Sequence, residues 1–404
     1  MLILTADRII VGDGKTTIEN GYIKINDKGQ IAETGEVKNL KKNSSDTLVS
    51  YEGCSIMPGL FDLHVHFGNF WHFKDKDIYN DFLISLYSAT NMKIALSKGV
   101  TTIRDVMGPD GLMTSLKNAV KLGYIQAPRI FHTNQAIICT GGHCWYYPDK
   151  VIMEADGVDA VRRAVRLQAR EGADFIKAMG NHGNKVDFDR NEMAAIVDEA
   201  HRLGKKCSVH ATIEESIDIA IDAGADTIEH GTFMNEKQAE KIAKSGQVWI
   251  PTLSAYSFWA NEALNPSTAK RRDSPHFYEY AVRLGQFYIN SAKANEATLK
   301  KYYDMGIKVA TGSDNGVAEI ADELELMCKY GLTPQQAIEC ATSNSADVCD
   351  IGDTVGKITM DYCADLLVTK GNPLDDIRTI RNVMDVYQNG KSLFAIKYID
   401  LDGH

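Results

Sequence analysis

Hydrophobic and polar positions alternate over short distances at both ends of the chain. Near the N-terminus, residues 2–4, 8–11, 22–25 and 30–32 are strand-like and are separated by turns rich in Gly and Asp. Near the C-terminus, residues 364–368, 383–387 and 392–396 have the same character, and residues 388–391 are typical of a hairpin turn. We therefore predict a small β-sandwich domain formed from both chain termini, residues 1–56 plus 358–404.

The middle of the chain, residues 57–357, alternates short apolar segments with longer helical patterns. The predicted strands end near residues 66, 106, 134, 179, 210, 230, 251 and 311, and the clearest helices are 192–203, 214–223 and 237–244. Gly204 and Gly224 are the expected helix stops. Eight strand–helix units predict an α/β fold with a (β/α)₈ TIM-like barrel, in which residues 254–300 form a helical insertion before the last strand.

Composition narrows the class of protein. With 404 residues and 44% hydrophobic content, the chain suits one large barrel plus an accessory domain. Its net charge of -10 disfavours a nucleic acid or an anionic membrane as a partner. The N-terminus does not resemble a signal peptide, no stretch of about 18 apolar residues occurs, and the 8 cysteines form no CxxC pair. We therefore expect a cytoplasmic protein with reduced thiols.

Candidate metal ligands stand at the ends of five predicted strands, where the sites of such barrels lie. They are His64 and His66, Lys177, His210, His230 and Asp314. Side chains at i and i+2 of a strand share a face, so His64 and His66 can reach one metal ion. A single histidine at a strand end is usually structural, but six such residues at corresponding ends indicate a metal centre.

Lys177 lies in an apolar strand, where an unpaired ammonium group is costly to bury. It has two interpretations. The lysine pairs with a carboxylate, or CO₂ carbamylates it, which removes the positive charge and creates a carboxylate that can bridge two metal ions. A further pair, Arg104 and Asp105 at the end of the second strand, is expected to form a buried ion pair that organises the barrel.

These motifs resemble those of the amidohydrolase superfamily over essentially the whole chain. Residues 59–66, 173–177, 210–211, 228–231 and 311–316 are most similar to its imidazolonepropionase-like and Xaa-Pro dipeptidase (prolidase-like) branch. The resemblance implies two divalent metal ions. One is bound by His64, His66 and Asp314, and the other by His210 and His230. A carbamylated Lys177 and a hydroxide bridge them.

The same resemblance implies a mechanism. The bridging hydroxide attacks the substrate carbonyl, and Asp314 acts as general acid and base. The ligand set suits Zn²⁺ best, with Mn²⁺, Co²⁺ or Fe²⁺ as alternatives. His143, flanked by Gly142 in the loop after the third strand, is a candidate catalytic residue that holds the carbonyl oxygen or an anionic group. Its alternative is an ordinary loop histidine.

Further candidates for substrate contact are Tyr146, His143, His182, Thr212 and Tyr256. Packing or loop roles are the alternative for each of them. Thr212 stands where dipeptidases of this branch commonly carry Tyr or His, and acidic residues follow it. This departure argues against a standard Xaa-Pro or Xaa-Arg dipeptidase.

We predict an enzyme, a binuclear metal-dependent hydrolase that acts on a C–N bond of a small-molecule amide or dipeptide-like substrate. A cyclic amide or imidazolone hydrolase is the first alternative, although those relatives usually use one metal and lack the lysine. A lactonase or organophosphate-type esterase on the same site is the second. A non-catalytic scaffold is disfavoured by the complete ligand set. The resemblance is compatible with a homo-oligomer.

Overall fold

The computed structural model describes residues 1–68, 80–270 and 278–393. The chain divides into two compact units. One consists of Met1–Phe61, Ile94–Thr102 and Leu332–His404, and the other of Asp62–Lys93 and Ile103–Gly331. The domain boundaries drawn from the sequence stay a prediction. Within the described ranges, no helix is long and apolar enough to cross a membrane.

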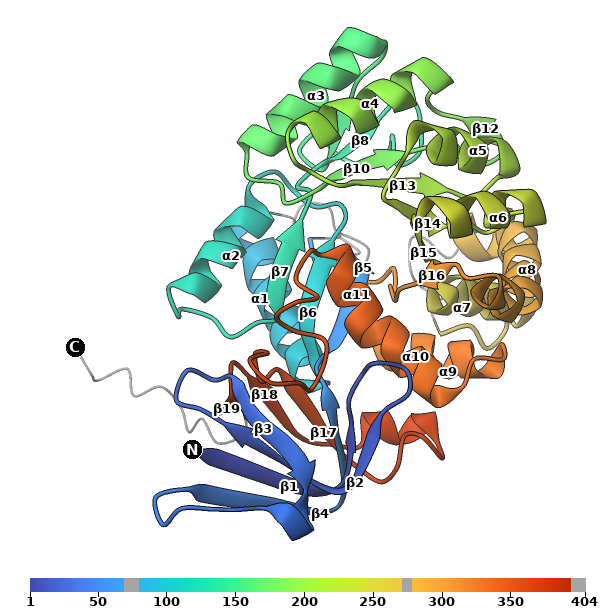
Figure 1. Cartoon of the computed structure of the whole chain (residues 1–404). Coiled ribbons are helices and arrows are strands. Elements are labelled where there is room, and N and C mark those ends of the chain that lie inside the picture. The colour runs from blue at the N-terminus through green and yellow to red at the C-terminus, as the bar shows by residue number, and fades with distance from the viewer. Residues whose placement is uncertain (69–79, 271–277, 394–404) are drawn as a thin grey trace. The chain divides into compact units, whose positions relative to one another are not determined.

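The first unit contains a seven-stranded sheet built from both ends of the chain, in the order β19-β18-β17-β4-β1-β2-β3 (Figure 1). Its strands are β1 (Leu2–Ile10), β2 (Thr17–Ile25), β3 (Ile31–Glu36), β4 (Thr47–Pro58), β17 (Leu366–Lys370), β18 (Val383–Gln388) and β19 (Lys391–Ser392). Strand β17 pairs antiparallel with β4, so that Leu366 lies opposite Pro58. This confirms the prediction that strands from both termini form one β-domain.

The hairpin between β18 and β19 forms where the sequence predicts it. Gln388 lies opposite Lys391, and Asn389 and Gly390 between them have φ values of 51° and 74°. Two positive φ values match the type I′ turn for which Asn-Gly is favoured. The remainder of the predicted last strand, residues 394–396, lies outside the described residues.

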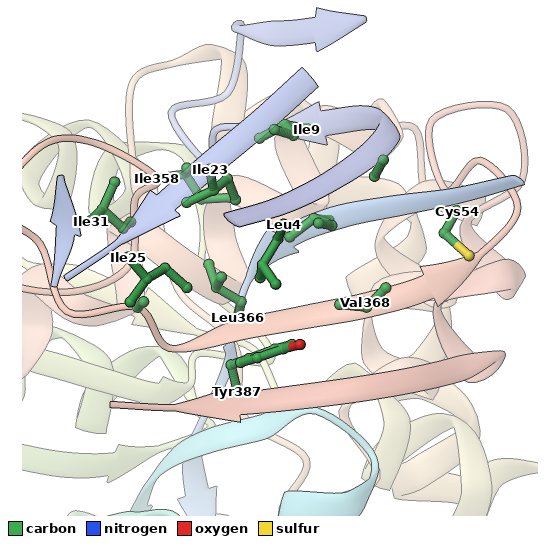
Figure 2. Close-up of a cluster of buried hydrophobic side chains, with 13 residues drawn as sticks. Leu4, Ile9, Ile23, Ile25, Ile31, Cys54, Ile358, Leu366, Val368 and Tyr387 are labelled. Carbon is green, nitrogen blue, oxygen red and sulfur yellow. The ribbon is translucent and has the colours of Figure 1, made fainter. Parts of the chain in front are cut away.

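Apolar side chains from the two ends of the chain form the core of this unit (Figure 2). Leu4 and Ile23, from β1 and β2, and Leu366 and Val368, from β17, are all fully buried in one cluster. In Figure 2 the side chains on β1 and β2 point toward those on β17 and β18. Burial of apolar surface therefore holds the N-terminal strands to the C-terminal ones.

Parallel strands and their helices make up the remaining fold. One sheet has the order β5-β6-β7, and a second, parallel throughout, has the order β16-β15-β14-β13-β10-β8-β9. The strands are β5 (Leu60–Val65), β6 (Val100–Asp105), β7 (Arg129–His132), β8 (Ala136–Ile138), β9 (Ile152–Glu154), β10 (Ile176–Met179), β13 (Cys207–Ala211), β14 (Thr227–His230), β15 (Val248–Ile250) and β16 (Lys308–Val309). A small hairpin, β11 (Asn181–His182) and β12 (Lys185–Val186), follows β10.

Helices cover the strands, as Figure 1 shows for α3, α4 and α5 beside β8, β10 and β13. The helices before β16 are α1 (Asp81–Ser97), α2 (Leu112–Lys121), α3 (Val158–Arg170), α4 (Arg190–Arg202), α5 (Glu214–Ala223), α6 (Glu236–Ser245), α7 (Leu253–Leu264), the π-helix η3 (Tyr278–Arg283) and α8 (Gly285–Asp304). Those after it are α9 (Ile320–Lys329), α10 (Pro334–Glu339), the π-helix η4 (Cys340–Asn344) and α11 (Ser345–Val348). The 3₁₀ turns within the described ranges include η1 (Val37–Asn39) and η5 (Ile377–Arg381).

Local signals explain the helices that the sequence predicts best. Helix α4 begins at a capping box. The Asp189 side chain accepts the backbone N–H of Glu192, and the Glu192 side chain accepts the backbone N–H of Asp189. Helix α5 ends at Gly224, whose φ of 80° is left-handed. The predicted helices thus agree with α4, α5 and α6 to within a few residues. The insertion is confirmed as helical over α7, η3 and α8.

The predicted third strand, residues 129–134, is interrupted. Asn134 has a φ of 61°, which ends β7 and lets a new strand, β8, begin at Ala136. The break matters because β7 belongs to the sheet of β5 and β6, whereas β8 pairs with β10. Residues 129–138 therefore connect the two sheets, and sequence alternation alone did not predict this division.

The chain after the short strand β16 runs beside β5. The N–H of Leu63 donates to the carbonyl of Thr311 (2.9 Å), and the N–H of Asp314 donates to the carbonyl of His64 (2.7 Å). Gly312 permits this approach, because a Cβ there would lie 2.6 Å from the Cβ of His64. Residue 314 is thereby held next to the end of β5.

Candidate active site

One cavity of about 700 Å³ in the second unit is lined by every residue that the sequence analysis singled out for metal binding or substrate contact. These are His64, His66, His143, Tyr146, Lys177, His182, His210, Thr212, His230, Tyr256 and Asp314. The strands explain part of the gathering, since β10, β13 and β14 are parallel neighbours that carry Lys177, His210 and His230. The roles of these residues stay predictions, but the structure brings all of them to one cavity.

His64, His66 and Asp314 form a cluster of metal-ligand type. The Oδ1 atom of Asp314 lies 3.0 Å from Nε2 of His66 and 3.6 Å from Nε2 of His64. One candidate ligand atom from each residue lies within 4.8 Å of the others. Burial opposes ionisation of Asp314, but the neighbouring His64 and His66 hold its pKa below the usual value. A carboxylate and two imidazoles therefore converge on one point.

His210 and His230 lie close to His64 and to one another. Their ring centroids are 4.6 Å apart, and the ring of His230 is 4.9 Å from that of His64. Burial lowers the pKa of both His210 and His230 well below the usual range, so both rings are neutral and offer a lone pair. The Nδ1 atom of His230 lies 2.7 Å from Oγ1 of Thr252, which leaves Nε2 for a ligand.

The backbone at two of these positions is left-handed. His230 has a φ of 67° and Asp314 a φ of 52°. Non-glycine residues rarely adopt this conformation, and strained residues of this kind cluster at functional sites. His230 ends β14, and Asp314 lies in the segment after β16 that bonds to β5.

Lys177 is the least expected member of the site. Its side chain is 1% exposed, and Nζ has no hydrogen-bond partner within the described residues. Burial lowers the pKa of Lys177 to about 8, which gives access to the neutral amine that reacts with CO₂. The salt-bridge interpretation finds no contact in the described part of the chain to support it. A buried amine that has no hydrogen-bond partner in the described residues and lies beside neutral imidazoles is consistent with binding of a group that the polypeptide itself does not supply.

His143 and His182 border the same space. The His143 ring stacks on His210 with centroids 4.2 Å apart and lies 5.7 Å from the ring of His182. The N–H of His143 donates to the carboxylate of Asp187 (2.7 Å), which anchors the loop after β8. Burial lowers the pKa of His143 to about 3, so the ring is neutral.

Thr212 is held by Asn181, a residue that the sequence analysis did not select. The Asn181 side chain accepts the N–H of Thr212 (2.9 Å) and donates to its hydroxyl (2.8 Å). Tyr256 lies farther along, with its ring 5.4 Å from that of His230. Tyr146 lines the cavity and shares a hydroxyl–hydroxyl contact of 2.8 Å with Tyr280.

The sequence analysis missed Glu229 and assigned Arg104 the wrong partner. Arg104 Nη2 pairs with Glu229 Oε1 at 2.5 Å, whereas the Asp105 carboxylate accepts the backbone N–H groups of Phe67 and Met107. Arg104 and Asp105 are adjacent in a strand and point to opposite faces, which explains the correction. The available signal for Glu229 was a carboxylate inside a predicted strand, directly before the candidate ligand His230.

Glu229 also orients a candidate ligand. Its Oε2 lies 2.6 Å from Nδ1 of His64, and its Oε1 accepts the hydroxyl of Ser208 at 2.6 Å. Burial opposes its ionisation, but Arg104 holds the pKa of Glu229 well below the usual range. Because the carboxylate accepts the Nδ1–H of His64, Nε2 keeps its lone pair toward Asp314.

The chain belongs to the amidohydrolase family, whose model matches residues 55–393. This confirms the superfamily that the motifs indicated. The family and its hydrolase members support an enzyme that hydrolyses C–N bonds.

Particular relatives cover nearly the whole chain. It is 29% identical to ochratoxinase from Aspergillus niger over 96% of this chain and 86% of the relative. It is 23% identical to imidazolonepropionase from Fusobacterium nucleatum, over 93% of this chain and 92% of that protein. Among solved structures, a Xaa-Pro dipeptidase with bound methionine in its active site has a TM-score of 0.86 and 27% identity, covering 97% of this chain and 99% of its own.

Proposed function

We propose that this protein is a binuclear metal-dependent hydrolase that cleaves the C–N bond of an amide or dipeptide-like substrate. The observation that carries the proposal is the buried, unpartnered amine of Lys177 in a cavity that neutral histidines and the Asp314 carboxylate share. The names of similar proteins, a Xaa-Pro dipeptidase and an ochratoxinase, support hydrolysis as the class of reaction.

Two sets of residues would hold two divalent ions. His64, His66 and Asp314 would bind one, and His210 and His230 the other. Lys177, carbamylated by CO₂, would present a carboxylate to both. When bound, two such ions, best Zn²⁺, lower the pKa of a water molecule and polarise a carbonyl as Lewis acids.

Asp314 would carry the proton in this reaction. Its carboxylate is ionised and lies beside the histidine pair, so it can take a proton from attacking water and return it to the leaving amine. His143 is neutral, and in the tautomer that places its N–H toward the substrate it can donate one hydrogen bond to the carbonyl oxygen. The cavity excludes most bulk water from these groups, which strengthens each polar interaction.

A closed barrel would account for this convergence. The segment 311–315 bonds to β5, and residues 129–138 connect the three-stranded sheet to the seven-stranded one. These two links support eight strands arranged as a (β/α)₈ barrel. In the first unit, the cluster between the N-terminal and C-terminal strands supports a β-sandwich rather than a flat sheet.

Metal analysis tests the proposal most directly. We expect about two divalent ions per purified chain, measured by mass spectrometry, and loss of amide hydrolysis when a chelator removes them. The variant Lys177→Ala should lose metal and activity together. Added propionate should restore part of both, because its carboxylate can occupy the space of the carbamate.

The control is Lys185→Ala, which removes an exposed lysine of the β11–β12 hairpin and should keep its metal. Full activity of metal-free protein would contradict the proposal. One tightly held ion with full activity in Lys177→Ala would favour the cyclic amide or imidazolone hydrolase instead. Hydrolysis of lactones or organophosphates without any amide turnover would favour the esterase alternative.

A further inference from the structure

Six aromatic side chains form a continuous wall on one side of the cavity. We call the set Tyr146, Tyr256, Trp259, Tyr280, Phe287 and Tyr288 the aromatic wall, and all six line the cavity. They come from the loop after β8, from α7, from η3 and from α8. Helices α7 and α8 pack against one another, as Figure 1 shows.

The wall begins beside His230, one of the candidate metal ligands. The ring of Tyr256 is 5.4 Å from that of His230, and it lies 5.6 Å from Tyr288 and 6.3 Å from Phe287. These spacings are those of interacting aromatic pairs. A group attached directly to a carbonyl near His230 would therefore meet aromatic rings before it met solvent.

The outer half of the wall is fixed by further contacts. Trp259 lies 5.0 Å from Tyr280 with a tilt of 31°, and Tyr280 lies 5.9 Å from Tyr288. The hydroxyls of Tyr146 and Tyr280 meet at 2.8 Å, which ties the loop after β8 to the π-helix η3. Trp259, Phe287 and Tyr288 remain partly exposed, so ring surface is left for a ligand.

Charged and polar groups also line the cavity. Arg283, at the end of η3, is paired with Glu279, so this cation is already neutralised. His182 and Lys185 of the β11–β12 hairpin add further polar groups to the lining. The cavity thus offers a ligand both aromatic surface and polar groups.

We infer that the aromatic wall is a substrate subsite that selects an aromatic group on one side of the scissile C–N bond. The inference rests on the proposed function and specifies the class of substrate. Offset and edge-to-face stacking against several rings favours planar aromatic groups over small aliphatic ones. Burial of a phenyl-sized group adds about 1.5–3 kcal/mol, which corresponds to a preference of about 10–100-fold.

Four amides test the inference. They are N-acetyl-L-alanine, N-acetyl-L-phenylalanine, N-benzoyl-L-alanine and N-benzoyl-L-phenylalanine, assayed with Zn²⁺-loaded enzyme. We expect an aromatic group on one of the two sides to raise kcat/KM about 10–100-fold. Trp259→Ala and Tyr288→Ala should each reduce that preference about tenfold, because the aromatic amides lose more kcat/KM than N-acetyl-L-alanine does.

The matched control is Trp145→Ala. Trp145 is 56% exposed and does not line the cavity, so the aromatic preference should persist in this variant. Melting curves of all three variants show whether each is folded. Equal kcat/KM across the four amides would overturn the subsite and leave the proposed function standing.

Binding measurements separate failure of the subsite from failure of the reaction. If no amide is hydrolysed, calorimetric titration compares the products L-phenylalanine and benzoate with L-alanine and acetate. Tighter binding of an aromatic product, lost in Trp259→Ala, would support the subsite although the proposed function had failed for these amides. Equal binding of aromatic and aliphatic products would overturn the subsite as well.

Discussion

Glu229 shows how a buried residue can orient another side chain that lines the cavity, His64. Its carboxylate is completely buried and accepts bonds from Arg104, Ser208, Thr227 and His64. The bond to His64 selects the tautomer whose Nε2 lone pair faces Asp314. A buried carboxylate without these donors would cost several kcal/mol, so the network is stable only as a whole.

We predict that Glu229→Gln lowers metal affinity about 10–100-fold, which is typical of changes to a partner of a metal-binding histidine. The amide can accept one bond but leaves Arg104 without its counter-charge. Competition with a chromogenic chelator measures the affinity. Glu199→Gln is the matched control, because Glu199 is also buried and bonded to arginines but belongs to α4. Equal metal affinity in wild type and Glu229→Gln would contradict the prediction.

At this scale the sequence was informative about candidate ligands and much less so about their partners. His64, Lys177 and Asp314 were predicted because each carries chemistry that an apolar strand end does not need. The pairing of Arg104 with Glu229 joins residues on β6 and β14, and no local pattern encodes it. Thr252 and Asn181, which hold His230 and Thr212, were missed for the same reason.

Among the elements, helices α3 and α4 are joined by ion pairs from arginines of α3 to the acidic residues Asp198 and Glu199 of α4. Glu199 of α4 accepts bonds from Arg162 (3.1 Å) and Arg166 (2.7 Å) of α3 and from Arg202 of its own helix. The bonds from Arg202 and Arg166 lower the pKa of Glu199 below the usual value of 4.5. The arginines are partly exposed, so solvent screening weakens the interaction.

Glu199→Gln should therefore destabilise the protein by about 1–2 kcal/mol at pH 7, at the low end for charged hydrogen bonds. Because the folded pKa is depressed, this contribution is present above pH 4.5 and is lost as the pH falls through the lower folded pKa. Urea unfolding of both proteins between pH 7 and pH 3 measures the difference. A difference that grows toward pH 3 would refute this account.

The elements also show where hydrophobic patterning stops being sufficient. Patterning placed α4, α5 and α6 well because caps and apolar stripes agree there. It treated residues 129–134 as one strand, whereas the left-handed Asn134 divides the region into β7 and β8. A backbone reversal of this kind depends on neighbours in other strands, such as the bond from the N–H of Gly108 to the carbonyl of Asn134 (2.9 Å).

At the scale of the whole molecule, we expect the two compact units to respond differently to metal removal. The proposed ligands all belong to the unit that contains Asp62–Lys93 and Ile103–Gly331. We predict that a chelator increases amide hydrogen exchange in β13 and β14, whose ends carry His210 and His230, and leaves β1 and β17 unchanged. Mass spectrometry of peptic fragments resolves these strands. Equal acceleration in both units would show that the metal stabilises the chain as one cooperative body.

The β-domain from both termini and the strand–helix alternation were predictable because each repeats a strong local pattern. The composition of the cavity wall was not, since its aromatic residues come from separate segments and gather only when α7, η3 and α8 fold together. The sequence predicts a helical insertion over residues 254–300 and shows that it carries aromatic residues such as Tyr256 and Trp259. It does not show which rings face the metal ligands.

The pairing of β4 with β17 has a consequence for the co-translational folding of this protein. Strand β18, the neighbour of β17, adds a bond from Tyr51 of β4 to Asp385, residues 334 positions apart, so β4 waits for strands that are synthesised much later. Until β17 emerges, the edge of β4 is unpaired and its apolar face has no cover, which favours association with other chains. Nascent copies of this protein should therefore depend on chaperones until β17 and β18 have been synthesised.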